Sequence, residues 1–459
     1  MRRDKIATLV LLFALMTSTP AVYGEVPSEP GFSQGRTVVS TGRVLPLRAR
    51  VEPVNRMLEA RFEEVLPRLM RESGIDMWLV INREYSEDPV YFTLVPEPVF
   101  AARRTTMLVF FDRGAEEGVE RLTVSRYPFS SLYEPAWEGG DLDEQWQGLA
   151  DVIAERNPRA IGIDVSRHWP VADGLTASLR DRLEEILAPE LVRRLQSAEA
   201  LAVRWLETRT RDELEVYPSI VALARSVVSE AFSDRVIVPG VTTTEDVAWF
   251  IAEKFSRLEL PIWFIPDVNL QRQGETCEVE DDFCGVSGTI QRGDVLHTDV
   301  GICYLRLCTD TQEMGYVLRP DENGVPGDLQ RSLAVGNRWQ DLLTGEFVTG
   351  RTGNEILAAA LEASEGELID ASVYTHPLGN FGHAPGPTIG MWDNQGGTPI
   401  QGEWTLHPST AYAIEGNVKV AVPGWDGQMI QMKLEQSAVF DGQKVLYLAG
   451  RQTEWHVVR

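Results

Sequence analysis

Four acidic residues and one histidine stand within apolar, strand-like segments in the last third of this 459-residue chain. In chain order they are Asp299, Asp310, His376, Glu415 and Glu435, in the segments VLHTDVG, CTDTQ, YTHPLGNFGH, YAIEGN and MKLEQS. A carboxylate that points into a sheet is costly unless charge compensates it, and neighbouring carboxylates raise that cost. For any one of these acids, an exposed place on an edge strand is the simple alternative. For all of them together, a shared pair of metal ions is the simplest compensation.

The same residues supply a full ligand set for two divalent ions. Oxygen and nitrogen ligands without thiolates suit Mn²⁺, Zn²⁺, Co²⁺ or Fe²⁺, and the excess of carboxylates favours Mn²⁺. Two ions that share a site can bridge a water molecule, lower its pKa and hold a carbonyl group against it. We therefore predict a metal-dependent hydrolase, with peptides as the favoured substrates.

A second histidine, His383, follows His376 by seven residues in a stretch rich in Gly and Pro. A lone histidine is most often a satisfied core or turn residue. The chain has only six histidines, however, and glycines around this pair allow the backbone to approach a bound group closely. We therefore favour a ligand or catalytic role for both.

Residues 1–24 have the layout of a signal peptide. Three basic residues precede an apolar run from Ile6 to Met16, and small residues end at Gly24. We expect cleavage after Gly24 and a periplasmic or secreted protein without stable membrane insertion. The net charge of −25 argues against nucleic acid as a partner.

The four cysteines, Cys277, Cys284, Cys303 and Cys308, lie close together in the chain. In an oxidising compartment an even number suggests disulfides. We favour a pair between Cys277 and Cys284, which flank an acidic loop. A zinc cluster of all four is the alternative, and the strand-and-hairpin context of Cys303 and Cys308 argues against it.

The length of the chain suggests two domains. Residues 25–50 look like an extended lead-in. Residues 51–208 alternate helical and strand patterns, with strands at 77–81, 107–111 and 160–165, and predict an α/β domain. Residues 209–459 predict an α+β domain whose helices start at TRDE, after GVTTTED and at TGNE, and whose strands carry the candidate ligands.

The order of two Asp, a His with a second His seven residues on, and two Glu resembles the metallopeptidase M24 superfamily of creatinase, methionine aminopeptidase and aminopeptidase P. The resemblance covers residues from about 209 to the end. TRDELEVY and VIVPGVTTTEDVAWFI also resemble segments of the Xaa-Pro aminopeptidase, prolidase and creatinase branch. The resemblance implies an α+β pita-bread domain after a smaller α/β domain, two divalent metal ions and a homodimer.

By position, the resemblance implies that Asp299 binds one metal ion through both carboxylate oxygens and that Asp310 and Glu435 bridge the two ions. His376 and Glu415 complete the ligands. Glu415 also accepts a proton from the bridging water, and His383 holds the scissile carbonyl group and stabilises the tetrahedral intermediate.

Several positions depart from the family pattern. The usual histidine upstream of the first Asp is missing, because none stands between 261 and 293. The remaining departures are Thr311-Gln312 after Asp310, Ala384 after His383, Pro385 and Pro387 beyond it, Gly416-Asn417 after Glu415, and Lys433 two residues before Glu435. We expect metal binding to survive these changes, which bear instead on the substrate.

His297 stands two residues before Asp299, so on a strand the two side chains share a face. One hypothesis is that it partly replaces the missing histidine or orients Asp299. A structural histidine at the end of a strand is the alternative. Lys433 is placed with His297 as a residue that contacts the substrate or supports the ligands.

The favoured function is hydrolysis of the peptide bond in Xaa-Pro substrates by a metal-bridged water or hydroxide, in the manner of aminopeptidase P or prolidase. One alternative is another C–N hydrolase or a lyase acting on a small molecule with the same scaffold. The other is a metal-poor binding protein.

Overall fold

The computed structural model describes residues 44–275 and 284–459, which belong to one compact unit running from Val38 to Arg459. The predicted signal peptide at 1–24 and Cys277 lie outside the described residues, as does most of the predicted lead-in. In the part of the chain that the structure describes, no helix has the length and apolar character needed to cross a bilayer.

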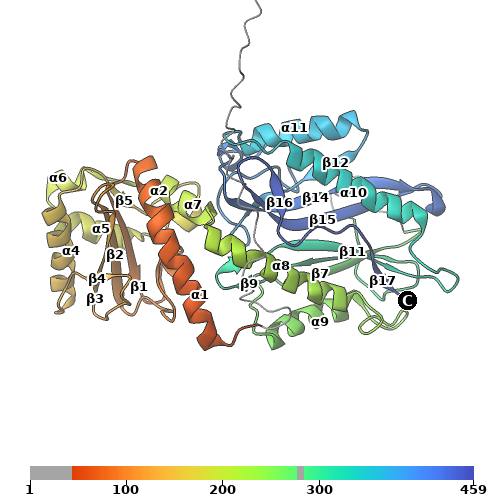
Figure 1. Ribbon diagram of the computed structural model, residues 1–459, viewed down its shortest axis with the longest axis horizontal. Coiled ribbons are helices and arrows are strands. Elements are labelled where there is room, and N and C mark those ends of the chain that lie inside the picture. Colours follow the sequence, from red (N-terminus) through yellow and green to blue (C-terminus); the bar gives the residue numbers. More distant parts are fainter. Residues whose placement is uncertain (1–43, 276–283) are drawn as a thin grey trace, which may run out of the picture. The chain divides into compact units, whose positions relative to one another are not determined.

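The first part of the described chain forms a six-stranded mixed sheet in the order β4-β3-β2-β1-β5-β6 (Figure 1). Its strands are β1 (Met77–Arg83), β2 (Thr105–Asp112), β3 (Val119–Ser125), β4 (Glu134–Pro135), β5 (Ile161–Ile163) and β6 (Leu195–Ser197). Its helical segments are α1 (Leu47–Ala60), a π-helical stretch (Arg61–Val65), α2 (Leu66–Glu72), α3 (Tyr91–Leu94), α4 (Leu142–Arg156), α5 (Ala177–Ile186), α6 (Pro189–Val192) and α7 (Glu199–Glu207).

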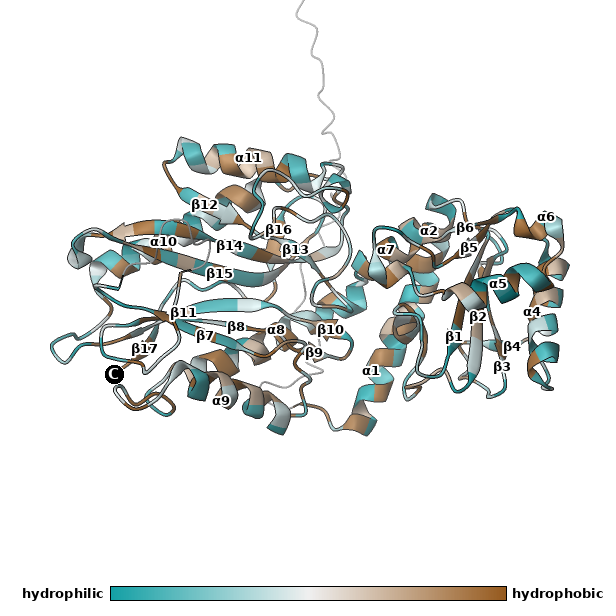
Figure 2. Ribbon diagram, turned by 180° about the vertical axis from the view of Figure 1, so that it is seen from behind, coloured by the Kyte–Doolittle hydropathy of each residue, from teal (hydrophilic) through white to brown (hydrophobic). Residues whose placement is uncertain are grey.

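The central strand β1 is buried on both faces, which explains its continuous apolar sequence and its brown colour in Figure 2. Trp78 and Val80 enter the core on one face, whereas Leu79 and Ile81 enter the core on the other. The strands predicted at 77–81, 107–111 and 160–165 correspond to β1, β2 and β5.

The second part forms a nine-stranded sheet whose main order is β12-β14-β15-β11-β8-β7, with β13 on β14, β16 on β15 and β17 on β11. Its strands are β7 (Asp267–Gln271), β8 (Val295–Val300), β11 (Thr311–Val317), β12 (Asp370–Val373), β13 (His376–Leu378), β14 (Thr410–Val422), β15 (Gln428–Phe440), β16 (Val445–Tyr447) and β17 (His456–Val458). Two short strands, β9 (Cys303–Tyr304) and β10 (Leu307–Cys308), form a separate hairpin.

Four long helices accompany this sheet: α8 (Arg211–Ala231), α9 (Thr244–Arg257), α10 (Gly327–Gly345) and α11 (Gly353–Gly366). Figures 1 and 2 show α10 and α11 on one side of the strands and α8 and α9 on the other. The helix starts predicted at TRDE and TGNE are confirmed, whereas α9 begins within GVTTTED and not after it; Thr210, Thr243 and Thr352 each cap a helix through a complete capping box.

A pair of buried carboxyl groups supports the first sheet. Asp88 and Asp164 share a side-chain hydrogen bond, and the Trp78 indole donates to Asp164 Oδ1 at 2.7 Å. Burial raises the pKa of Asp88 to about 6 and that of Asp164 well above the usual range, so the pair retains a proton.

We predict that Asp164→Asn makes the protein less sensitive to alkaline pH. The folded state holds protons that the unfolded chain has released above about pH 4, so stability should fall as the pH rises towards and beyond 6. An amide at 164 can donate to Asp88 without a titrating proton. Urea denaturation at pH 5 and pH 8 measures this, and an equal loss between the two pH values in wild type and variant would contradict it.

Candidate metal centre

The strand register places the candidate acidic ligands in one row across the second sheet. Asp299 on β8 lies opposite Gln312 on β11, Gln312 lies opposite Glu435 on β15, and Glu435 lies opposite Glu415 on β14. Residues directly opposite one another share a face, and Asp310 precedes Gln312 by two residues, which brings it to the same face.

His376 completes the cluster from β13, which pairs with β14 through Ala413. Its Nε2 atom lies 3.6 Å from Asp310 Oδ2, 3.6 Å from Glu415 Oε2 and 3.7 Å from Glu435 Oε1. The other ring nitrogen, Nδ1, lies 3.1 Å from the carbonyl oxygen of Pro377. Because a carbonyl oxygen only accepts, Nδ1 carries the proton and Nε2 turns its lone pair towards the carboxylates.

The atoms of the five candidate ligands fall into two overlapping groups of three, and Asp310, His376 and His383 form a third group that includes the second histidine. Asp299, Asp310 and Glu435 each offer an oxygen, and these atoms lie within 4.8 Å of one another. His376, Glu415 and Glu435 form a second group within the same limit. Glu435 belongs to both groups, and Asp310 also lies near His376, so the arrangement has room for two ions with shared ligands.

The chemistry of these atoms fits bound cations. Buried Asp299 Oδ1, Asp310 Oδ1, His376 Nε2 and both oxygens of Glu435 accept no hydrogen bond among the described residues. Buried polar atoms without partners are rare in folded proteins and point to an ion or water at the site. A histidine lone pair facing three carboxylates is repulsive unless a cation lies between them.

The electrostatics agree with this reading. Burial, together with the neighbouring Asp267 carboxylate, raises the pKa of Asp299 to about 7. Burial and mutual repulsion raise the pKa values of Asp310, Glu415 and Glu435 well above their usual range. A divalent ion would reverse these shifts, because it favours the ionised carboxylates.

His383 lies next to the cluster on the loop that follows β13. Its ring centroid is 4.6 Å from that of His376 and 5.0 Å from that of Trp263, and its Nε2 atom lies 3.4 Å from the Tyr374 hydroxyl. The His383 side chain is exposed, whereas His376 is buried. Partial desolvation lowers the pKa of His383, so the ring is neutral near pH 7.

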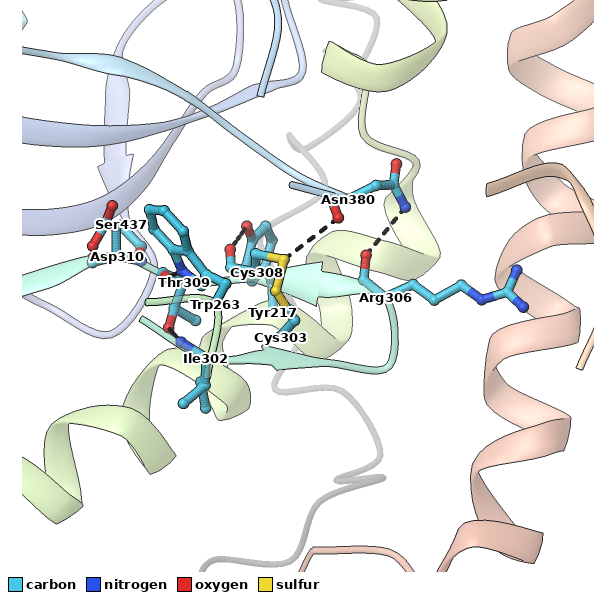
Figure 3. The surroundings of a disulfide bond; sticks show 10 residues. All are labelled: Tyr217, Trp263, Ile302, Cys303, Arg306, Cys308, Thr309, Asp310, Asn380 and Ser437. Carbon is cyan, nitrogen blue, oxygen red and sulfur yellow. Dashed lines mark hydrogen bonds between the residues drawn. A yellow bond between two sulfur atoms is a disulfide. The ribbon is translucent and has the colours of Figure 1, made fainter. Parts of the chain in front are cut away.

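The disulfide between Cys303 and Cys308 closes the β9–β10 hairpin, which returns the chain from Asp299 to Asp310 (Figure 3). The Cys308 backbone N–H donates to the Gly379 carbonyl at 2.7 Å, and Tyr217 donates its hydroxyl to the Cys308 carbonyl. The Trp263 indole donates to the Thr309 carbonyl at 2.9 Å. The hairpin therefore holds the second acidic ligand against the loop that carries His383.

This disulfide bears on the alternative of a zinc cluster. Bonded sulfurs cannot act as thiolate ligands, so a cluster of all four cysteines is ruled out as long as Cys303 and Cys308 stay joined. The favoured pair of Cys277 and Cys284 includes a residue outside the described part of the chain.

His297 and Lys433 lie beside the candidate metal ligands. His297 is buried between β7 and β11, with Nδ1 3.0 Å from Asn269 Nδ2 and Nε2 2.9 Å from Gln312 Oε1. Lys433 Nζ donates to Asn269 Oδ1 at 3.2 Å. The predicted orientation of His297 towards the face of Asp299 agrees with the register, because His297 pairs with Asn269 and Asp299 with Asp267.

Sequence reasoning missed three residues of the site. Gln312 entered only as a departure from a family pattern, yet it lies at the centre of the row and donates to Glu415 Oε1 at 2.6 Å. Tyr374 and Trp263 were not singled out, although both flank His383. Tyr374 stands two residues before His376, and this spacing was the available signal.

Comparison with known proteins places the chain. Residues 219–439 match the family model of metallopeptidase family M24, so this part of the chain belongs to the family. No curated protein matches at a significant level. Among solved structures, X-Pro aminopeptidase from Thermotoga maritima MSB8 matches with a TM-score of 0.59 and 17% identity, covering 85% of this chain and 100% of that one.

Two further structures are similar. Dipeptidase PepE from Mycobacterium ulcerans has a TM-score of 0.55 and 17% identity, covering 91% of this chain and 99% of that one. Xaa-Pro dipeptidase from Bacillus anthracis has a TM-score of 0.54 and 16% identity, covering 89% of this chain and 100% of that one. These likenesses confirm the α+β pita-bread fold with a smaller preceding α/β domain. Membership of the family supports a hydrolase of the metallopeptidase class.

We predict that divalent metal stabilises the protein more at pH 8 than at pH 5. The metal-free folded protein holds carboxyl protons up to about pH 7 at Asp299, whereas the unfolded chain releases them near pH 4. Stability without metal should therefore fall as the pH rises through this window, and metal should restore it, because metal requires ionised ligands. Melting temperatures with Mn²⁺ or with chelator at both pH values measure the effect.

The matched control is Glu435→Gln, which removes the ligand shared by the two groups. This variant should lose most of the metal-induced shift and melt higher than metal-free wild type at pH 8. An equal shift at both pH values, or an undiminished shift in the variant, would contradict the prediction.

We predict that Cys303→Ser/Cys308→Ser lowers the free energy of unfolding by about 2 kcal/mol, because the crosslink restricts only a short loop in the unfolded chain. Urea denaturation of oxidised proteins measures this. An unchanged midpoint would mean that the backbone contacts of Cys308 and its partner Tyr217 suffice to hold the hairpin.

Proposed function

We propose that the protein is a dinuclear-metal hydrolase that cleaves the peptide bond of Xaa-Pro substrates, in the manner of aminopeptidase P or prolidase. The observation that carries the proposal is the convergence of five ligand side chains, four of which have buried lone pairs without a hydrogen-bond donor among the described residues: Asp299, Asp310, His376 and Glu435. Asp299, Asp310 and Glu435 would hold one ion. His376 and Glu415, with the shared acids, would hold the other.

When bound, the two ions would act as Lewis acids that activate water and polarise the scissile carbonyl group. The residues of the chain supply the rest. Glu415 lies against His376 and is placed to accept the proton of the attacking water. His383 is neutral, exposed and adjacent to the cluster, so it can donate a hydrogen bond to the oxygen that gains charge in the tetrahedral intermediate.

The aromatic residues beside His383 support a substrate with an apolar ring. The Trp263 and Phe264 rings lie 4.4 Å apart between centroids, and Trp263 also contacts His383. Such a wall suits the pyrrolidine ring of proline, which buries apolar surface without needing a hydrogen-bond donor. Two similar structures are those of an X-Pro aminopeptidase and an Xaa-Pro dipeptidase, at 17% and 16% identity.

Further parts of the proposal concern the metal, the compartment and the assembly. The excess of carboxylates favours Mn²⁺, with Zn²⁺, Co²⁺ or Fe²⁺ as other candidates. The signal-peptide layout of residues 1–24 and the Cys303–Cys308 disulfide both support a periplasmic or secreted protein. A homodimer follows from the resemblance to the Xaa-Pro branch.

We predict that the mature protein, loaded with Mn²⁺, Zn²⁺ or Co²⁺, hydrolyses Xaa-Pro dipeptides or longer Xaa-Pro peptides. Glu415→Gln should lower kcat about 10²- to 10⁴-fold because it removes the proton acceptor. His383→Ala should lower kcat about 10²- to 10³-fold because it removes an oxyanion donor. Steady-state kinetics with the released N-terminal residue Xaa as the readout measures all of these, and the preferred peptide length separates aminopeptidase from prolidase.

The control is His168→Ala. His168 is an exposed histidine in the part of the chain that forms the six-stranded sheet, and it pairs with Glu199. It should retain wild-type activity. A protein that holds two metal ions but cleaves no Xaa-Pro peptide would favour a small-molecule C–N hydrolase or lyase. A protein that binds no metal would favour a binding role.

A further inference from the structure

A buried series of hydrogen bonds ends on Glu415. Lys433 Nζ lies 3.2 Å from Asn269 Oδ1, and Asn269 Nδ2 lies 3.0 Å from His297 Nδ1. His297 Nε2 lies 2.9 Å from Gln312 Oε1, and Gln312 Nε2 lies 2.6 Å from Glu415 Oε1. The four residues before Glu415 are all buried.

The contacts at the two ends of this series fix the direction in which its hydrogen bonds are donated. Lys433 Nζ faces Asn269 Oδ1, and an amide oxygen only accepts, so the Asn269 amide N–H is turned towards His297. At the other end the Gln312 amide nitrogen donates to Glu415 Oε1, so the Gln312 oxygen is turned back towards His297. His297 must then accept at Nδ1 and donate at Nε2. Each member therefore has its donor directed towards Glu415.

We propose that this directional chain, from Lys433 through His297 to Gln312, positions the carboxylate of Glu415 in the metal centre. Gln312 holds Oε1, which leaves Oε2 facing His376 Nε2 at 3.6 Å. Glu415 therefore presents one defined oxygen to the ligand cluster. Gln312, His297 and Lys433 are positioning residues, and the inference rests on the proposed role of Glu415 as a metal ligand.

The neutral members of the chain suit this task. A cation next to Glu415 would compete with a metal ion for the same carboxylate, whereas a neutral amide donates a hydrogen bond without adding net charge. The Lys433 amine lies at the far end, behind Asn269. The hydrogen-bond chain therefore orients the ligand and keeps the amine away from it.

The register explains how residues far apart in sequence form the chain. Asn269 lies opposite His297 on the neighbouring strand, and Gln312 lies opposite both Asp299 and Glu435. Lys433 precedes Glu435 by two residues and shares its face. His297, Gln312 and Lys433, which look like separate peculiarities of the sequence, are therefore parts of one arrangement.

The first test reads the tautomer of His297 in metal-free protein. Nitrogen-15 NMR of histidine-labelled protein, with the signal assigned from His297→Phe, should show a proton on Nε2 and a bare Nδ1. A proton on Nδ1 would overturn the proposed direction of the chain. This readout needs neither metal nor substrate.

The second test measures Mn²⁺ affinity by competition with a chelator. Gln312→Met removes the donor to Glu415 at similar size and should weaken binding of one of the two ions about 10- to 100-fold. His297→Phe should weaken it in the same direction, because Gln312 loses its orientation. The double variant should be no weaker than Gln312→Met, because both changes act through the same contact.

The control is Thr298→Val on β8, the strand that also carries His297. The buried Thr298 hydroxyl donates to the Asp267 carbonyl oxygen and does not contact the hydrogen-bond chain. It should leave Mn²⁺ affinity unchanged. Wild-type Mn²⁺ affinity in Gln312→Met, or fully additive losses of affinity in the double variant, would overturn the positioning role of the hydrogen-bond chain. The proposed function would still stand. A wild-type protein that binds no Mn²⁺ despite the expected tautomer would instead remove the proposed function, and with it the role of the chain.

Discussion

Much of the second domain depends on the burial of like charges. Asp310 and Glu435 are buried, Asp299 and Glu415 are partly buried beside them, and a histidine lone pair faces three of the four. Such a cluster is strongly unfavourable unless cations occupy it. Burial and mutual repulsion raise the pKa values of Asp310, Glu415 and Glu435 well above their usual range in the absence of metal. The sheet, the hairpin and the histidine loop all hold this cluster in place.

The sheet does so through its register. β11 and β15 join at a single residue pair, Gln312 with Glu435, whereas β14 and β15 pair along their whole length. The two halves of the sheet therefore meet at the ligands themselves. The disulfide-closed hairpin brings Asp310 back beside Asp299, and its contacts with Gly379 and Asn380 reach the loop that carries His383 (Figure 3).

The residues around the ligands form two groups with different tasks. On the exposed side, Trp263 and Tyr374 surround His383, so this side is where a substrate can approach. On the buried side, His297 and Gln312 support Glu415 through hydrogen bonds and stay away from solvent. Under the proposed function, the first group faces the substrate and the second group supports the metal ligand Glu415.

The sequence alone determined the helix starts at Thr210 and Thr352, the strands β1, β2 and β5, and the fold. These follow from local capping patterns, from apolar periodicity and from the ordered set of acids and histidines, all of which are readable along the chain. Only the tertiary structure decided that Gln312 lies between Asp299 and Glu435 and that His297 forms a hydrogen bond with Gln312. The same holds for Trp263 and Tyr374, which flank His383. These contacts depend on strand register and on the path of the loops, which spacing in a sequence does not fix.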